Sequence, residues 1–269
     1  MVISDKVCYL QLHRTASIFI ASLLKKYIPN TKQIGIHNRA SDKTYNSNLL
    51  FIGSVRNPWD WYISMWAKGS GKVGILYNRL TDRKIYFDYL GLKTNPLLSP
   101  YIFFQQFYKP INRWRDTYSD VRDPKKFRAW LKLMYSRKYD PGSGFGLSSI
   151  SKFSGHMTFR YLTLFAKENK KLFNNNIKNY IDLNSYDKEN NVIKLMIRNE
   201  ELLDDFFKLF NLIGVDLTEE LKMEIRKIKK TNVSLRSLTT ADYYDDETKE
   251  LVANREKLII NKYNYKFPI

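Results

Sequence analysis

Two strand–turn–helix patterns near the start of the sequence constrain the fold more than any other feature. Residues 7–12 (VCYLQL) predict a buried strand, residues 13–17 (HRTAS) a short polar turn, and residues 18–27 a helix. Residues 49–55 (LLFIGSV) predict a second buried strand, and a helix begins at Pro58. Apolar strands that alternate with helices indicate a parallel sheet covered on both faces. We therefore expect an α/β protein with a central parallel sheet flanked by helices, and a ligand crevice beyond the C-terminal ends of the strands.

The rest of the chain extends this pattern. Residues 68–145 are rich in aromatic and basic side chains and contain several prolines and a Gly-Ser-Gly break. We expect them to form helices and loops inserted over the crevice, so that residues 1–269 make one domain. Later segments predict further elements: a helix at 155–165, a strand at 192–197, and helices at 200–212, 218–230 and 246–263.

Charge and composition narrow the class of partner. The 269 residues include 45 Lys and Arg against 27 Asp and Glu, a net charge of +18. This surplus favours an anionic partner, namely a nucleic acid, an anionic surface, or a ligand that carries phosphate or sulfate. A general bias toward Lys, Asn, Ile and Tyr codons in an AT-rich genome would produce the same surplus.

The cysteine count and the hydropathy pattern exclude other classes. Cys8 is the single cysteine, which excludes an internal disulfide framework and a cysteine-based zinc site. No apolar run approaches the ~18 residues that cross a bilayer, so we expect a soluble, cytoplasmic protein with no membrane span. The sequence does not indicate an oligomeric state.

The first strand–turn–helix pattern contains features that are typical of an anion-binding site. Backbone N–H groups at a helix start, together with the helix dipole, favour a phosphate. Arg14 adds a positive charge, and Thr15 and Ser17 add hydroxyl groups. The alternative is a plain turn in which Ser17 caps the helix. The pattern is not the phosphate loop of nucleotide triphosphatases, because Gly-x-x-x-x-Gly-Lys-Ser/Thr is absent.

The second strand–turn–helix pattern indicates a phosphate site more specifically than the first. Arg56 follows a strand directly, where its guanidinium can hold a phosphate through two hydrogen bonds. Ser64 lies eight residues later, about two helical turns away, and can offer a hydroxyl to the same phosphate. The alternative makes Arg56 a surface ion-pair partner and Ser64 an ordinary helix residue.

Taken together, the two patterns resemble sulfotransferases that use 3′-phosphoadenosine 5′-phosphosulfate (PAPS). In that family Pro-Lys-x-Gly-Thr/Ser-Thr grips the 5′-phosphosulfate, and Arg-x-Pro-x-x-x-x-x-Ser grips the 3′-phosphate. Here Arg56 and Ser64 match the second motif, whereas Arg14 stands for the usual lysine and Ala16 for the usual glycine of the first. The resemblance implies a P-loop-like sulfotransferase fold with helical insertions. It also implies that residues 14–17 (Arg14, Thr15, Ala16 and Ser17), Arg56 and Ser64 bind PAPS.

Downstream segments resemble the same family. Residues 197–202 (IRNEEL) are similar to its Arg-x-Glu-x-Leu segment, and residues 243–245, 251–252 and 265–267 to its C-terminal signature. Residues 230–236 (KTNVSLR) are similar to its nucleotide-side loop, which implies nucleotide contacts for Asn232, Ser234 and Arg236. The alternative for this last segment is a solvated basic helix end.

The resemblance implies a reaction that moves a sulfuryl group from PAPS to a hydroxyl or amine acceptor without a metal. Arg14 would stabilise the charge on the leaving 5′-phosphate. We expect His37, which lies beyond the first helix, to act as the general base. His156 is the second candidate, although it also suits packing at a helix start. His13 would orient Arg14 or contact the substrate.

Several functions remain open on the sequence alone. The aromatic and basic segments within 68–145 suit a polar glycan or a small metabolite as acceptor, but equally a packed helical lid. A sulfotransferase-like protein that binds nucleotide but has lost catalysis is one alternative, because Arg14 and Ala16 depart from the motif. A basic nucleic-acid-binding module is another, although no helix-turn-helix, zinc-finger or RNA-binding signature supports it and we expect no nucleic-acid partner.

Overall fold

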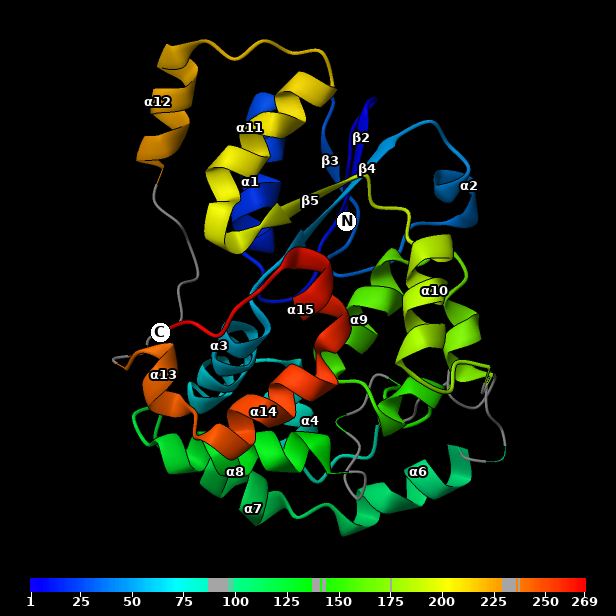
Figure 1. Cartoon of the computed structure of the whole chain (residues 1–269), viewed down its shortest axis with the longest axis vertical. Helices are drawn as coiled ribbons and strands as arrows, with labels where there is room; N and C mark the ends of the chain where they lie inside the picture. Colours follow the sequence, from blue (N-terminus) through cyan, green and yellow to red (C-terminus); the bar gives the residue numbers. More distant parts are fainter. Residues whose placement is uncertain are drawn as a thin grey trace. The chain divides into compact units, whose positions relative to one another are not determined.

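The structure is a computed structural model that describes residues 1–86, 97, 99–136, 141, 144–174, 176–228, 236 and 238–269 (Figure 1). The chain divides into two compact units. The first comprises Met1–Asn57, Tyr161–Lys167 and Asn190–Val233, and the second Pro58–Arg160, Glu168–Glu189 and Ser234–Ile269. The expected insertion at 68–145 is therefore part of the second unit.

The first unit is built on a five-stranded mixed sheet with the strand order β3-β1-β2-β4-β5. Its strands are β1 (Val2–Ile3), β2 (Val7–Leu10), β3 (Lys32–Gln33), β4 (Leu50–Val55) and β5 (Leu195–Arg198). β2 pairs with β4 and β4 with β5 in parallel, while β1 runs antiparallel to both of its neighbours. The predicted α/β class is confirmed. The sheet is mixed rather than parallel throughout, because β1 pairs antiparallel with β2 and β3. The sequence did not indicate β1 and β3, because strands of two residues are too short to leave a hydrophobic pattern.

Helices α1 (Ser17–Tyr27) and α11 (Leu202–Leu212) cover one face of this sheet (Figure 1). Tyr9, Ile52 and Ile197 belong to the same buried cluster as the apolar side chains of both helices. The register places Tyr9 opposite Ile52, so these side chains share one face. The short turn η4 (Asn199–Glu201) leads from β5 into α11, and α12 (Glu219–Lys227) adds Ile225 to the cluster.

The opposite face carries Phe51 and Gly53. The Phe51 ring packs on Tyr45 of the short helix α2 (Asp42–Tyr45), with ring centroids 5.6 Å apart. A Cβ atom at Gly53 would lie 2.9 Å from Cζ of Phe165, at the end of α9 (His156–Phe165). Gly53 is therefore the point at which an aromatic ring packs directly on the strand backbone.

The second unit is helical in the described residues. Its aromatic core includes Trp61, Trp66 and Trp130, all fully buried. The indole N–H of Trp66 donates to the Thr117 carbonyl oxygen at 2.7 Å, so burial leaves that donor satisfied. Trp59 is buried in the same unit. The helices besides α9 are α3 (Pro58–Ser70), α4 (Ile75–Thr81), α6 (Ser99–Gln105), α7 (Ile111–Thr117), α8 (Pro124–Tyr135), α10 (Tyr180–Asn190), α13 (Thr240–Tyr243), α14 (Asp246–Arg255) and α15 (Lys257–Tyr263), with 3-10 turns η1 (Gln106–Tyr108), η2 (Ser149–Lys152) and η3 (Asn169–Phe173).

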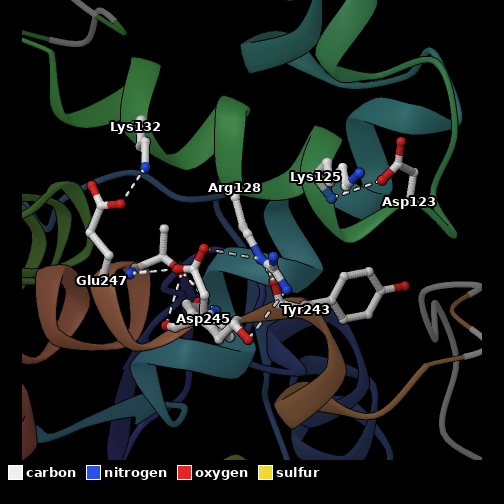
Figure 2. A network of polar contacts seen from close by, with 9 residues as sticks. Asp123, Lys125, Arg128, Lys132, Tyr243, Asp245 and Glu247 are labelled. Carbon is white, nitrogen blue, oxygen red and sulfur yellow. Dashed lines mark hydrogen bonds and ion pairs between the residues drawn. The ribbon is translucent and has the colours of Figure 1, made fainter.

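Charged side chains join α8 to the chain around α13 and α14 (Figure 2). Nε of Arg128 donates to the Tyr243 carbonyl oxygen at 3.0 Å and lies 3.6 Å from Oδ2 of Asp245. Asp245 also caps α14 by accepting from the Thr248 N–H at 2.9 Å. Residues 243–245, which resemble a C-terminal family signature, therefore form a corner that packs the second unit.

The C-terminal helix expected over 246–263 is two helices, and the prediction of one was wrong. α14 ends at Arg255 and α15 begins at Lys257, on either side of the fully buried Glu256. The Glu256 carboxylate accepts hydrogen bonds from the N–H groups of Met157 and Thr158, at 3.1 and 2.8 Å, and from the Tyr62 hydroxyl. The interruption between α14 and α15 coincides with these hydrogen bonds between Glu256 and the start of α9. The hydrophobic pattern of residues 246–263 does not indicate the interruption.

Other predicted elements are shifted at their ends only. The strand expected at 192–197 is β5, which starts three residues later, and the helix expected at 218–230 is α12, which ends at Lys227. None of the helices in the described ranges is both long and apolar enough to cross a membrane.

A buried carboxylate also organises the corner after β5. Asp205 accepts from the backbone N–H and from Nε of Arg198, each at 3.0 Å, and from Nζ of Lys208 at 2.7 Å. Burial alone would raise the pKa of Asp205, but the hydrogen bonds from Arg198 and Lys208 outweigh it, so the pKa lies below its ordinary value of 3.8. The ionised form of Asp205 therefore stabilises the fold.

Replacing Gly155 by alanine should destabilise the second unit. A Cβ atom there would lie 1.9 Å from Oε1 of Glu256, which would displace the carboxylate from the start of α9. We expect Gly155→Ala to lower the free energy of unfolding by about 3 kcal/mol, through lost hydrogen bonds and overpacking. Chemical denaturation measures this. Gly71→Ala is the matched control, since its nearest neighbour would be 3.4 Å away; equal effects of the two variants would contradict the packing at Gly155.

Asp205→Asn should lower the free energy of unfolding by about 2 kcal/mol near neutral pH, because it removes charge-assisted hydrogen bonds. The folded-state pKa of Asp205 is depressed, so its contribution is complete above 3.8 and disappears as the pH falls through the folded-state pKa. The difference between wild type and variant should therefore narrow below pH 3.8 in urea unfolding curves. A difference that stays constant down to the acid transition would show that Asp205 is not the titrating group.

Candidate functional site

The candidate site lies where the three parallel strands of the first unit end. β2, β4 and β5 end at Leu10, Val55 and Arg198, and parallel strands place these ends at one edge of the sheet. The loop after β4 is joined to the loop after β5, because the N–H of Asn57 donates to Oε1 of Glu200 at 2.8 Å. This edge corresponds to the ligand position expected from the strand pattern.

The loop after β2 has an unusual backbone. Arg14 and Ala16 both adopt positive φ angles, of 62° and 55°. Ala16 is the N-cap residue of α1 in a left-handed conformation, without a side-chain cap, and Ser17 is the first helical residue. Left-handed backbone favours glycine and costs an alanine about 1–2 kcal/mol. The conformation therefore explains physically why a glycine would fit at Ala16, where the similar motif has one.

The Thr15 side chain holds this loop against the sheet. Its hydroxyl donates to the Leu12 carbonyl oxygen at 2.9 Å and lies 2.6 Å from the Ser54 hydroxyl, which is 2.7 Å from the hydroxyl of Tyr9. All three hydroxyl groups are buried, and burial raises the pKa of Tyr9. A ligand contact by Thr15 would therefore use its backbone N–H. Ser17 is also buried, and its carbonyl oxygen accepts from the Gln11 side chain at 3.3 Å.

Two arginines, Arg14 and Arg56, follow neighbouring parallel strands at this edge of the sheet. The pKa of Arg14 is lowered from its ordinary value, first by burial and then by the positive charge of Arg56. Nε of Arg56 is buried as well. Arg14 comes from the loop after β2 and Arg56 from the loop after β4, so the sheet brings together two cations that are far apart in sequence. An anion with more than one negative charge suits such a pair.

His37 lies beside the same loop. Its Nδ1 atom is 2.8 Å from the Gln11 carbonyl oxygen, and its ring stacks on His13 with centroids 3.6 Å apart. A carbonyl oxygen only accepts hydrogen bonds, so Nδ1 carries the hydrogen and the neutral ring presents Nε2 as its proton acceptor. His37 has a φ of 59°, and its backbone therefore also depends on this packing.

Gln11 is a site residue that the sequence reasoning missed. Its carbonyl oxygen accepts from His37, its Oε1 accepts from the Gln33 side chain at 2.7 Å, and its Nε2 donates to the Ser17 carbonyl oxygen. Gln11 is almost fully buried. The available signal was a single amide inside the apolar run 7–12, since a buried amide must find hydrogen-bond partners.

Three other predicted site residues lie in the second unit. Ser64 is a buried residue of α3. His156 is the first residue of α9, and burial holds its pKa well below the ordinary value, with Arg160 donating to its Nε2 at 2.8 Å. Arg236 is ion-paired with Asp60 at 2.9 Å. The burial of His156 suits its alternative role in packing at a helix start. Arg236 forms a salt bridge with Asp60, and a nucleotide contact by Arg236 would have to replace that salt bridge. Asn232 and Ser234 lie outside the described residues.

In the described ranges no three His, Cys, Asp or Glu side chains are grouped as metal ligands, and the expected absence of a metal stays a prediction. Cys8 is buried on β2, and burial raises the pKa of its thiol to about 12, so it stays protonated. The side chains available at this edge are thus the guanidinium groups of Arg14 and Arg56 and the imidazole of His37.

The sequence and the structure were also compared with known proteins. No protein-family model, no curated protein and no solved structure matches this chain. The interpretation of the site therefore rests on its residues and their geometry.

Proposed function

We propose that this protein is a PAPS-dependent sulfotransferase, whose acceptor presents a hydroxyl or amine group on a glycan or small metabolite. The observation that carries the proposal is the convergence of Arg14 and Arg56 at the C-terminal edge of the parallel strands. The order of the motifs along the sequence supports it independently. A P-loop-like sulfotransferase fold is part of the same proposal.

The residues at this edge fit a nucleotide with several anionic groups. Arg14 and the first N–H groups of α1 would hold the 5′-phosphosulfate, and Arg56 the 3′-phosphate. A contact between Ser64 and the 3′-phosphate stays a prediction from the sequence motif. The positive φ at Ala16 supports this proposal, because the similar motif has a glycine at this position and glycine favours such a φ angle. Nucleotide contacts by Asn232, Ser234 and Arg236 belong to the same proposal.

The chain's own groups divide the chemistry between them. When bound, PAPS supplies the sulfuryl group, which exchanges its bond to the 5′-phosphate oxygen for one to the acceptor oxygen. Arg14 stays protonated, so it stabilises charge on the phosphate but does not transfer a proton. His37, fixed through Nδ1 by Gln11, accepts the acceptor's proton at Nε2. His13, stacked on His37, limits the orientations of that ring.

Nucleotide binding tests the first half of the proposal. Calorimetric titration with 3′-phosphoadenosine 5′-phosphate should show saturable binding to the wild type. Arg56→Ala should weaken it by roughly 10- to 100-fold, which corresponds to the loss of a charge-assisted hydrogen bond. Arg226→Ala, which removes the same charge from the exposed face of α12, should bind as the wild type does.

Equal affinity of Arg56→Ala and wild type would remove Arg56 from the site. Binding of a single-stranded oligonucleotide with steep salt dependence, in the absence of mononucleotide binding, would instead favour the nucleic-acid module.

Transfer of labelled sulfate from PAPS to a panel of glycans and metabolites tests the second half. His37→Ala should reduce transfer by about 100-fold or more, because it removes the general base, while its affinity for the nucleotide stays within about twofold of wild type. His13→Ala is the matched control and should retain more transfer than His37→Ala. Full transfer in His37→Ala would exclude it as the base. Nucleotide binding by the wild type without transfer to any acceptor would favour the inactive alternative.

A further inference from the structure

The second unit exposes a group of large aromatic side chains on α6 and η1. Tyr101, Phe104, Phe107 and Tyr108 are 59, 60, 58 and 82% exposed. Tyr101 and Phe104 are three residues apart on α6, so they lie on one side of that helix. The ring centroid of Phe107, in η1, lies 6.3 Å from that of Phe104. Water-exposed aromatic residues gathered in one place mark an interaction surface rather than ordinary surface composition. We call these four side chains the aromatic patch.

The segment that bears the patch is firmly attached. The Gln106 side chain pairs with Tyr86, accepting from its N–H at 2.6 Å and donating to its carbonyl oxygen at 2.7 Å. Nζ of Lys109 donates to the carbonyl oxygens of Arg79, Asp82 and Lys84 at 2.9–3.1 Å, at the C-terminal end of α4. The patch is therefore presented by a braced surface rather than by a loose loop.

The described segments that carry and brace the patch are basic. The described stretches 75–86 and 99–117 contain six Lys and Arg residues and two Asp residues. Arg83, Lys84 and Arg113 are exposed. One of the two aspartates, Asp116, is already ion-paired with Lys126. An aromatic patch with basic residues on neighbouring segments complements a surface whose outer layer is anionic and whose interior is apolar.

We propose that the aromatic patch docks this protein onto the anionic headgroup surface of a phospholipid bilayer. Phe104 and Phe107 would enter the boundary between headgroups and acyl chains, the tyrosine hydroxyls would stay at headgroup level, and the basic residues would face the anionic lipids. This inference does not depend on the proposed sulfotransferase activity.

Two other occupants fit the patch less well. Stacking of nucleic-acid bases needs aromatic ring faces that are open to the bases. The rings of Phe103, Phe104 and Phe107 instead pack on one another, with centroids 5.7–6.3 Å apart, which leaves less ring face open for a base. A second copy of the chain would bring the same basic surround against itself, and like charges repel.

Vesicle sedimentation tests the proposal with the full chain. We expect binding to vesicles of phosphatidylcholine with phosphatidylglycerol, and weaker binding to phosphatidylcholine alone. The double variant Phe104→Ser, Phe107→Ser should lose at least about tenfold in partitioning, because it removes two inserted apolar groups. Ile181→Ser combined with Met223→Ser is the matched control, since it removes two exposed apolar side chains from α10 and α12. Arg113→Gln should weaken binding to the anionic vesicles alone.

The outcomes separate the alternatives. Circular dichroism of each variant verifies the fold, which the exposed substitutions should leave intact. Absence of binding to anionic vesicles at low salt, or equal binding by the aromatic and control variants, overturns the proposal. Without vesicle binding, loss of oligonucleotide affinity in the aromatic variant would assign the patch to nucleic acid, and loss of self-association in size-exclusion chromatography would assign it to a second copy.

Discussion

Parallel pairing of β2, β4 and β5 is the constraint on which the candidate site depends. In parallel strands every chain reversal from sheet to helix falls at the same edge, so loops that are distant in sequence become neighbours. Arg14 and Arg56 are 42 positions apart in the numbering, yet the charge of one lowers the pKa of the other. The bond from Asn57 to Glu200 ties a third loop into the same edge. The hydrogen-bonded pairing of β2 with β4 places the loops that carry these two like charges next to each other.

The polar groups beneath this edge keep its shape. Thr15, Ser54 and Tyr9 form a buried hydroxyl chain, and Gln11 links the start of α1 to the loop that carries His37. These groups are satisfied by one another in a low-dielectric interior, where an unmade hydrogen bond is costly. Positive φ angles at Arg14, Ala16 and His37 are tolerated because that network holds them. An edge that is fixed before a ligand arrives is what binding and catalysis both require.

The second unit uses buried charge differently. Glu256 is enclosed by N–H and hydroxyl donors, and burial raises its pKa against the opposing effect of those hydrogen bonds. Its carboxylate accepts hydrogen bonds from the N–H groups of Met157 and Thr158 at the start of α9. Glu256 also lies between the end of α14 and the start of α15. The aromatic patch on α6 and η1 is the opposite case, because large apolar groups are left facing solvent on a braced surface.

Local patterns predicted the main strands and helices of the first unit and suggested where a site would lie. Continuous apolar runs predicted β2 and β4, Pro58 predicted the start of α3, and the α/β alternation predicted a site at the strand ends, because these signals depend only on neighbours in the chain. Tertiary structure alone decided that the Thr15 hydroxyl meets that of Ser54, that Gln11 contacts His37, that Arg236 pairs with Asp60, and that Glu256 caps the start of α9. Each of these depends on a partner tens to hundreds of residues away, and hydrogen bonds between distant groups leave no periodicity in the sequence.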